Sequence, residues 1–496
     1  MSADHAGRSP ARRLRRFPGH GWAWPAGGRD RLLRAALLAD DAAALAAARR
    51  WLDEHDINSA GFAEHRLLLA IATRLSEALA DHPAWPRLAG LQKMLWTRSQ
   101  LALRDTLPAL RALHAAGIPL MMLKGASRIA VDAAAQRGRI AYDIDVLVPA
   151  AAMGQALDLL HERGWLAASG VSHPYLRARL GAQRAINLQY GRFGDIDLHQ
   201  CAYHPLQADA GDDRAIWERA RPARFGGLDV WVPSAADRVA LAIAHGARNT
   251  AAHSDWLVDA AVTLRQGQTD AAQLMDVLRR RRLLDPAAVA LSYLACGLDV
   301  ALPEGLLDAV RAAAGRPGLT RLMTLASMKP KQGLNPVLRL LRRGVRVLAA
   351  RAERRTMPPE VTVKGKVVAG ARAAHEAAAV LRAELPLPAA PARGTTLRFD
   401  LRLRFEMPVL PSSRGIRLEL KAAGVHLAHL VYRHARKRGG PLILRFRGEV
   451  PCPLPLGALS LESRWLRHCR DGEPQSTVER FEALPFRVLS ARVEPG

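Results

Sequence analysis

The spacing of apolar residues divides the chain into helical, mixed and strand-like stretches. Between Arg29 and Gly117 apolar residues recur every three or four positions, which predicts an N-terminal helical region at 29–117. From Leu120 the period changes and short apolar runs alternate with helical patterns. The runs at 120–123, 140–148, 185–190 and 195–200 are predicted strands, and 124–138 and 151–164 are predicted helices. This alternation predicts a core at 118–232 in which helices cover a sheet.

Helical spacing returns after residue 232 and gives way to strict alternation near the C-terminus. Ser234 and Asp237 form a capping-box pattern at the start of a helical domain predicted at 233–383. A Pro- and Ala-rich linker follows at 384–396, and residues 397–496 alternate as in amphipathic strands. The sequence therefore predicts a small antiparallel, sandwich-like β domain at 397–496 and a flexible basic tail at 1–28.

Composition and charge add limits to this picture. The 496 residues suffice for two or three domains, and 49% hydrophobic residues allow a sizeable core. The net charge of +26 suits a polyanionic partner, although the charges are spread along the whole chain. The basic amphipathic stretch Asn335–Arg355 is a candidate for contact with an anionic surface.

Targeting signals and cysteine usage suggest a compartment. No apolar run is long enough to span a bilayer, and the basic N-terminus is not followed by the apolar stretch of a secretory signal. The four cysteines, Cys201, Cys296, Cys452 and Cys469, show no CxxC pairing. These features favour a cytoplasmic protein and argue against a structural zinc site.

Two aspartates one residue apart stand in the strand predicted at 140–148. Side chains alternate along a strand, so Asp143 and Asp145 should project to the same side while their apolar neighbours face a core. Two carboxylates this close repel each other unless a cation lies between them. Mg²⁺ prefers carboxylate oxygens and leaves room for phosphate oxygens, so the pair is a candidate magnesium site.

Two nearby segments strengthen that hypothesis. The turn before the helix at 124–138 carries Lys124 and Gly125, followed by Ser127, and a helix start offers N–H groups to a phosphate. Asp197, in the strand at 195–200, could supply a third carboxylate from a neighbouring strand. Three carboxylates beside a phosphate-binding turn are typical of two-metal phosphoryl or nucleotidyl transfer.

The segments "LKGAS", "RGRIAYDIDVLV" and "GDIDLHQ" together resemble the polymerase-β-like nucleotidyltransferase superfamily, and more closely a bacterial nucleotidyltransferase family within it. The resemblance covers Arg104 to Leu264 and includes a helical "W-x-x-D" segment. It implies an α+β fold, with a polymerase-β-like core of mixed sheet and helices, flanked by helical regions and followed by the antiparallel β domain.

The resemblance also implies roles for individual residues. Asp143, Asp145 and Asp197 would be catalytic metal ligands for two Mg²⁺ ions, with a nucleoside triphosphate as substrate. Lys124, Gly125, Ser127 and Arg139 would bind the nucleotide, whereas His199 and His245 match family positions of uncertain role. The wider superfamily has Gly-Gly or Gly-Ser at the turn, but here Ala126 follows Gly125.

Three hypotheses of function remain open from the sequence. The first is a Mg²⁺-dependent enzyme that transfers a nucleoside monophosphate to a hydroxyl on a sugar, a protein or a small molecule. The second is a non-catalytic binding or scaffold protein on the same fold, for a polyanion or a protein partner. A kinase or phosphatase is the weakest of the three, because the chain has no P-loop and no kinase catalytic loop.

Overall fold

The computed structural model describes two compact units, the first formed by residues 1–165 and 183–357 and the second by residues 166–182 and 358–496. The residues it describes are 19–168, 173–178, 180–204, 213–249, 253–315, 318–330, scattered positions in 336–347, then 362–367, 379–385, 396–407, 413–422, 425–432, 440–451, 459–467 and 480–495.

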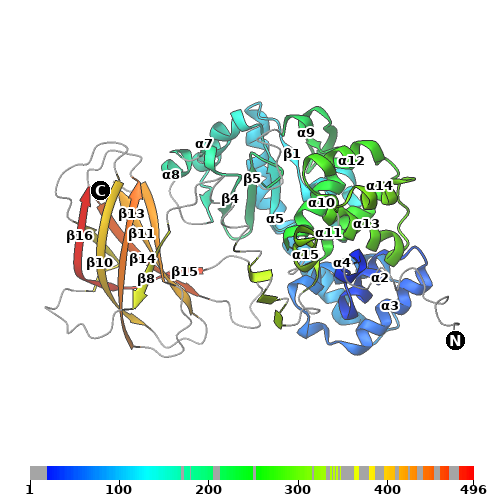
Figure 1. Ribbon diagram of the computed structural model, residues 1–496, viewed down its shortest axis with the longest axis horizontal. Helices are drawn as coiled ribbons and strands as arrows, with labels where there is room; N and C mark the ends of the chain where they lie inside the picture. The colour runs from blue at the N-terminus through cyan, green and yellow to red at the C-terminus, as the bar shows by residue number, and fades with distance from the viewer. Residues whose placement is uncertain are drawn as a thin grey trace. The chain divides into compact units, whose positions relative to one another are not determined.

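A mixed sheet of short strands carries the segment with the two aspartates (Figure 1). Its strand order is β3-β4-β5-β2-β1-β7-β6. The strands are β1 (Met121–Met122), β2 (Ile144–Leu147), β3 (Leu166–Ala167), β4 (Ala185–Tyr190), β5 (Gly194–His199), β6 (Arg221–Phe225) and β7 (Leu228–Val232). β2 runs parallel to β5 and antiparallel to β1, and β1 runs parallel to β7, so the predicted mixed sheet is confirmed.

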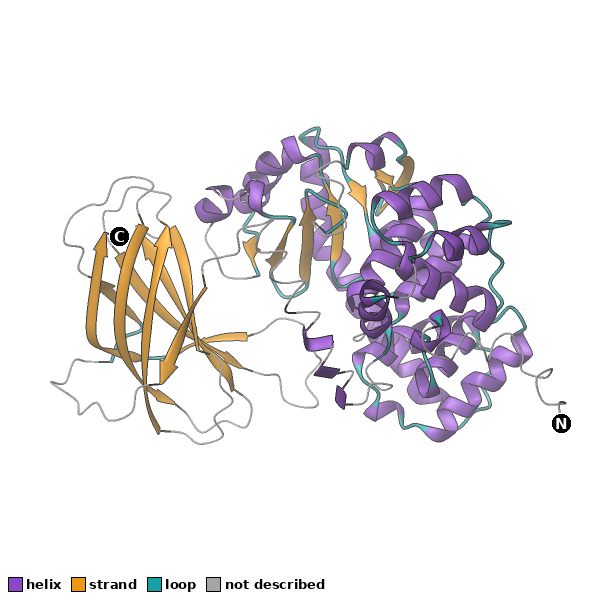
Figure 2. Cartoon of the chain, viewed as in Figure 1, coloured by secondary structure: helices purple, strands orange, loops and turns teal. Residues whose placement is uncertain are grey.

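Helices dominate the rest of the first unit (Figure 2). Its α-helices are α2 (Gly27–Leu37), α3 (Asp41–Glu54), α4 (Phe62–Arg74), α5 (Trp85–Ala115), α6 (Lys124–Val131), α7 (Met153–Glu162), α9 (Arg214–Glu218), α10 (Ala235–Asn249), α11 (Asp255–Arg265), α12 (Ala271–Arg280), α13 (Leu284–Leu298), α14 (Leu306–Ala313) and α15 (Leu319–Met328), whereas α8 (His173–Ala178) belongs to the second unit. Its short 3-10 helices are η1 (His20–Ala23), η2 (Ile57–Ser59), η3 (Ala133–Arg137) and η4 (Ala150–Ala152), and η5 (Leu180–Ala182) belongs to the second unit.

Local sequence explains where α10 begins. Ser234 precedes the helix, and its hydroxyl accepts a hydrogen bond from the Asp237 backbone N–H (3.2 Å) and donates one to the Asp237 carboxylate (2.8 Å). This satisfies backbone donors that the first turn of a helix leaves unpaired. The Asp237 carboxylate is held in turn by Arg219 at 2.7–2.8 Å. The start of α10 is thus fixed by one short buried network.

The structure differs from the flexible tail expected at 1–28. Residues 19–28 include η1 and the start of α2, and Trp24 is buried against Tyr293 with ring centroids 5.7 Å apart. Burying an indole removes a large apolar area from water, which fixes this segment on the helical core. The expected tail therefore ends before residue 19 at the latest.

The second unit is built mainly of β-strands. They are β8 (Thr362–Val367), β9 (Arg382–Leu385), β10 (Thr396–Met407), β11 (Ser413–Ala422), β12 (Val425–Tyr432), β13 (Gly440–Pro451), β14 (Leu459–Arg467), β15 (Arg480–Ala483) and β16 (Phe486–Pro495). Their order is β15-β14-β11-β12-β8-β13-β10-β16, with β9 paired to β14. Among the described strand pairs of this unit, β12–β8 is parallel and the others are antiparallel. Apolar side chains from strands along the whole sheet form one core.

Two sequence-based boundaries change with this arrangement. The helical domain expected at 233–383 would include β8 and β9, but both strands pair within the β unit. The linker expected at 384–396 begins inside β9, and most of it lies outside the described residues. The basic helix expected at Asn335–Arg355 also lies for the most part outside them.

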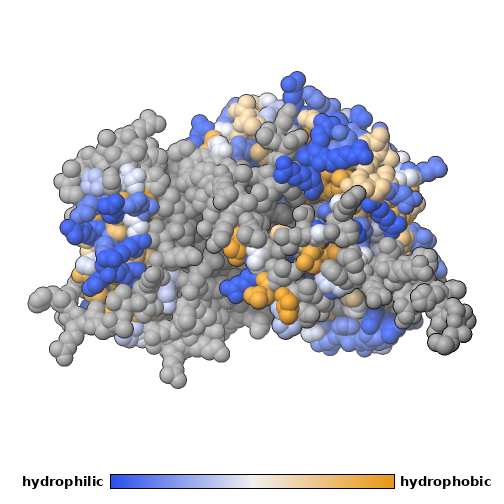
Figure 3. Space-filling model, in the orientation of Figure 1, coloured by the Kyte–Doolittle hydropathy of each residue, from blue (hydrophilic) through white to orange (hydrophobic). Residues whose placement is uncertain are grey.

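The described surface carries mainly hydrophilic side chains on the face shown in Figure 3, with apolar residues in small groups among them. Large exposed hydrophobic side chains, such as Met94 and Leu166, are few among the described residues. Within the same residues, no helix combines the length and the apolar character that crossing a bilayer requires.

Candidate metal and nucleotide site

The pairing of β2 with β5 places Asp145 directly beside Asp197. The two strands run parallel, and their register aligns Asp145 with Asp197 and Leu147 with His199. Because side chains alternate along each strand, Asp197 and His199 project to the same side of the sheet. Ile144 and Val146 of β2 are fully buried on the other side. Apolar residues on one face thus hold the polar group on the other.

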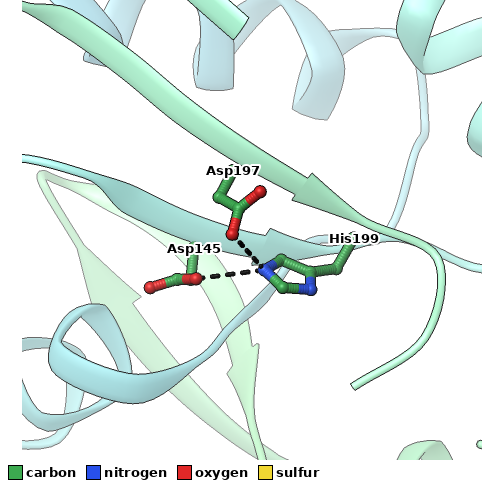
Figure 4. A group of neighbouring side chains, drawn as sticks. All are labelled: Asp145, Asp197 and His199. Carbon is green, nitrogen blue, oxygen red and sulfur yellow. Dashed lines mark hydrogen bonds and ion pairs between the residues drawn. The ribbon is translucent and has the colours of Figure 1, made fainter. Parts of the chain in front are cut away.

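The three polar side chains meet at one nitrogen atom (Figure 4). The Nε2 atom of His199 lies 3.0 Å from Asp145 Oδ1 and 3.0 Å from Asp197 Oδ2. One ligand atom from each residue falls within 4.8 Å of the others, a spacing at which one metal ion could be shared. His199 and Asp145 are almost fully buried, and Asp197 is partly exposed. Solvent therefore reaches this group from the side of Asp197.

Lys124 brings a positive charge to the same carboxylates. It is the first residue of α6, separated from the end of β1 by one residue, and its Nζ atom contacts Asp145 Oδ1 and lies 3.9 Å from Asp197 Oδ2. The Leu123 N–H donates to the Asp145 carbonyl oxygen at 3.0 Å, which ties the start of α6 to β2. The predicted nucleotide-binding lysine and two predicted metal ligands are thus neighbours.

Asp145, His199 and Lys124 shift one another's pKa values toward their charged forms. Burial alone would raise the pKa of Asp145, but the Lys124 charge and the His199 hydrogen bond outweigh it and hold that pKa well below its usual range. Burial opposes the charged form of His199, yet Asp197 and Asp145 together raise the pKa of the imidazole. Burial likewise opposes the charged form of Lys124, but Asp145 and Asp197 raise its pKa. The site therefore favours the ionised form of Asp145 beside the charged forms of Lys124 and His199.

The donor set fits a divalent cation. Two carboxylate oxygens suit Mg²⁺ and Mn²⁺, and an imidazole nitrogen is a ligand that Mn²⁺ and other transition metals accept readily. Asp145, Asp197 and His199 are therefore the residues that would hold a metal ion. The sequence pattern pointed to both aspartates, whereas it left His199 without a defined role.

Asp143 lies apart from this group. It is exposed and precedes the first residue of β2, whereas Asp145 is buried within the strand. Asp143 is absent from the set of described residues that could share one metal ion. Its charge still contributes to raising the pKa of Lys124. The two aspartates that stand out in the sequence thus occupy different environments.

Arg139 is committed to two acidic residues of α11. Its Nη1 atom lies 2.7 Å from Asp255 Oδ2, and its Nε and Nη2 atoms contact the Asp259 carboxylate at 3.0–3.2 Å. Despite burial, the Asp259 and Asp255 charges raise the pKa of Arg139. The guanidinium also packs on Gly125, where an added Cβ would lie 3.3 Å from Arg139 Cζ. The guanidinium thus packs closely against the face of Gly125 that has no side chain.

A cavity between α6, α10 and α11 brings further predicted residues together. Lys124, Ser127, Arg139 and His245 all line it. Burial lowers the pKa of His245 to about 3, and the nearby Lys124 and His253 charges act in the same direction. His245 is therefore neutral at physiological pH, on the opposite wall from the helix that carries Ser127.

Sequence reasoning missed the acidic and basic partners around this cavity. Asp255, Asp259 and Arg128 line it, and Arg128 Nη1 lies 3.2 Å from Asp259 Oδ1. The available signal was the "W-x-x-D" segment, because its last residue is Asp259 and Asp255 directly precedes its tryptophan. That segment was recognised, but its partners lie more than a hundred residues away in the chain.

Comparison with known protein families agrees with this geometry. A model of the family described as "uncharacterised nucleotidyltransferase" matches residues 61–299. This part of the chain belongs to that nucleotidyltransferase family. No curated protein and no solved structure matches the chain.

The limits of the nucleotidyltransferase domain coincide with helix ends. Residue 61 is the N-cap of α4 and residue 299 is the C-cap of α13. The domain therefore contains all seven strands of the mixed sheet and the helices α10 and α11 that line the cavity. It extends well beyond the stretch Arg104–Leu264 on which the sequence resemblance rested.

Proposed function

We propose that the domain is a Mg²⁺-dependent nucleotidyltransferase that moves a nucleoside monophosphate from a nucleoside triphosphate to an acceptor hydroxyl. The observation that supports this most strongly is the parallel register of Asp145 and Asp197, which sets two carboxylates and His199 beside the start of α6. Metal-assisted nucleotidyl transfer needs such a group beside a place for phosphates.

Each step of the reaction has a candidate residue. A bound divalent cation would neutralise triphosphate charge and lower the pKa of the acceptor hydroxyl. Lys124 and Ser127, at the start of α6, would bind phosphate oxygens, with Gly125 allowing a close approach. Asp197 is the more exposed carboxylate of the pair and would accept the proton of the acceptor hydroxyl.

The proposed reaction exchanges one phosphorus–oxygen bond for another, as in other nucleotidyl transfers. The acceptor oxygen forms a bond to the α-phosphorus, and the bond between that phosphorus and the oxygen bridging to the β-phosphate breaks. Pyrophosphate leaves, and the proton of the hydroxyl passes to the carboxylate. Arg139 would act through its fixed ion pairs, by holding α6 against α11, in place of the phosphate contact that the resemblance implies.

Three finer expectations remain proposals: the number of metal ions, the location in the cell and the acceptor. Two Mg²⁺ ions require a further ligand beside the Asp145–Asp197 pair, and the exposed Asp143 is the candidate for it. A cytoplasmic location is consistent with Cys201 and Cys296, which are free thiols among the described residues. The acceptor is a sugar, a protein or a small molecule.

Calorimetric titration of ATP, GTP, CTP and UTP, with and without Mg²⁺, tests the proposed function. We expect wild-type protein to bind at least one nucleotide only with Mg²⁺, and Asp145→Asn and Asp197→Asn to lose that binding. Asp308→Asn, on the surface of α14, serves as the matched control. Absence of Mg²⁺-dependent binding in the folded wild type would reject the transferase.

A non-catalytic binding protein on the same fold is the second candidate. It is favoured by the ion pairs that already neutralise the site, because Lys124 contacts Asp145 and Arg139 is held by Asp255 and Asp259. The proposed partner is then a polyanion or a protein, and the stretch Asn335–Arg355 stays a predicted anionic-surface contact. Salt-dependent polyanion binding without any Mg²⁺-dependent nucleotide binding would support this alternative.

A further inference from the structure

Lys124 lies beside the two carboxylates that would hold a metal ion, and His199 contacts the same two carboxylates. Asp145 and Asp197 are aligned on neighbouring strands, and like charges so close need a cation beside them. The Lys124 ammonium contacts Asp145 Oδ1 and lies 3.9 Å from Asp197 Oδ2. A divalent cation that bound the same oxygen of Asp145 would repel this ammonium. The two cations therefore compete for one oxygen.

The backbone of Lys124 is unusual for its position. Among the described residues, Lys124, Arg282 and Asp299 are the non-glycine residues with positive φ, and Lys124 has φ 46°. Asp299 caps the C-terminus of α13 and Arg282 follows the C-cap of α12, places where left-handed residues are common. Lys124 begins a helix, where no such preference applies. The residue with this uncommon backbone conformation is also the one whose ammonium contacts Asp145.

We propose that Lys124 is a displaceable internal cation: its ammonium neutralises Asp145 and Asp197 in the metal-free protein and leaves when a divalent cation binds. The inference rests on the proposed function, because it assumes that a metal binds these carboxylates. Lys124 also lines the cavity between α6, α10 and α11, and we infer that the displaced ammonium turns toward this cavity. There it would meet the phosphates of a bound nucleotide.

Binding of Mn²⁺ alone, without nucleotide, tests the proposal. Mn²⁺ titrations followed by electron paramagnetic resonance should compare wild type with Lys124→Met and Lys124→Gly. Both variants remove the ammonium, but only glycine also relieves the positive φ. We expect Mn²⁺ to bind about tenfold more tightly to both, within the usual range for coupled sites. Arg128→Gln is the control, because it removes a nearby charge that is paired with Asp259 instead.

A labelling experiment tests the same proposal on the wild-type protein and does not depend on the folding of a variant. Acetylation of Lys124, followed by mass spectrometry, should become faster when Mn²⁺ is added, because the displaced ammonium no longer contacts Asp145. Acetylation of the exposed Lys93 should not change. Slower labelling of Lys124 in the presence of Mn²⁺ would contradict displacement.

The outcomes separate this inference from the proposed function. Wild-type Mn²⁺ binding that Asp197→Asn abolishes, with equal or weaker binding in both Lys124 variants, would overturn the inference and leave the transferase standing. Wild-type protein that binds no Mn²⁺ would overturn both. Tighter binding in both variants, with Arg128→Gln unchanged, would support the internal cation.

Discussion

The guanidinium of Arg139 and the carboxylate of Asp259 lie against each other although 120 residues separate them in the chain. Arg139 Nε donates to both carboxylate oxygens at 3.1 and 3.2 Å, and Nη2 donates to one of them at 3.0 Å. Arg139 also reaches Asp255, so it connects the loop before β2 to the first turns of α11. One side chain thus joins the segment before β2 to α11 beside the candidate site.

Removal of this guanidinium should be strongly destabilising. Arg139→Met leaves Asp255 and Asp259 with fewer partners in a buried place, and breaking such a pair typically costs about 3–5 kcal/mol. Denaturant unfolding measures the loss in the free energy of unfolding. Arg224→Gln, which breaks the exposed Arg224–Asp229 pair on β6 and β7, should cost less than about 1 kcal/mol. If both variants lost a similar free energy of unfolding, the buried ion pairs of Arg139 would contribute no more stability than an exposed surface pair.

Gly246 should tolerate no larger side chain. An added Cβ would lie 2.3 Å from the Trp256 ring, where α10 and α11 meet. Gly246→Ala must therefore push the helices apart, and we expect it to lower the free energy of unfolding by about 1–3 kcal/mol. Gly90→Ala in α5 is the control, because a Cβ there meets nothing within 4 Å. That control should gain about 0.5–1 kcal/mol, since alanine favours a helix. A stable Gly246→Ala protein would mean that α10 and α11 are loosely packed.

His245 should make the first unit sensitive to acid. Burial and the Lys124 and His253 charges lower its folded pKa to about 3, below the value of about 6.5 in an unfolded chain. The folded state therefore binds a proton less readily, and stability present above pH 6.5 is lost as the pH falls toward 3. His245→Gln should flatten the dependence of the melting temperature on pH between 6.5 and 4.

Two other histidines help to interpret the acid sensitivity of the His245→Gln protein. His20, whose burial lowers its pKa to about 4, should leave some acid sensitivity in the His245→Gln protein. His114→Gln, at an exposed position on α5, should leave the pH profile of the wild type unchanged. If His245→Gln and wild type showed the same dependence of melting temperature on pH, His245 would not be a cause of acid sensitivity.

Asp400 should contribute more to the stability of the β unit than an acidic residue in a single surface ion pair. It accepts hydrogen bonds from Arg445 (2.6 and 2.8 Å) and Arg447 (2.7 Å), and those bonds hold its pKa below the usual range. Arg402 stands directly opposite Arg445, so Asp400→Asn would leave like charges crowded on one sheet face. We expect a loss of about 0.5–1 kcal/mol, larger at low salt.

Hydrogen exchange in β10 and β13 would measure the effect of Asp400→Asn locally. Faster exchange in these strands, with unchanged exchange in β2 and β5, is the expected result. Glu449→Gln, which removes only the exposed pair with Arg398, should have a smaller effect. Equal exchange in the two variants would show that Asp400 acts as a single surface ion pair.

The strands that carry the site were predictable because their signal is local. The alternation around Asp145 and Asp197 predicted β2 and β5, and the predicted strand at 185–190 coincides with β4. The pairing of Asp145 with Asp197 was expected only as a contact between neighbouring strands. The sequence does not contain the register itself, because parallel partners are chosen by the packing of the whole sheet.

Other parts of the fold depend on partners far away in the chain. The β6–β7 hairpin was missed because its strands are short, and Pro222 weakens the strand pattern of β6. β8 was assigned to a helical domain although "TVKGKV" alternates, and its partners β12 and β13 lie more than sixty residues later. The ion pairs of Arg139 have the same origin, since no local period specifies a contact across 120 residues.

The packing of Arg139 on Gly125 predicts a pattern of variation within the family. A Cβ at position 125 would lie 3.3 Å from the guanidinium, so a larger residue there requires Arg139 to shift by a few tenths of an ångström. Relatives with a larger residue in place of Gly125 should carry a shorter residue in place of Arg139 more often than relatives that keep the glycine, and a shorter residue at position 139 removes the partner that Asp255 and Asp259 share. The four positions should therefore vary together as one inherited unit.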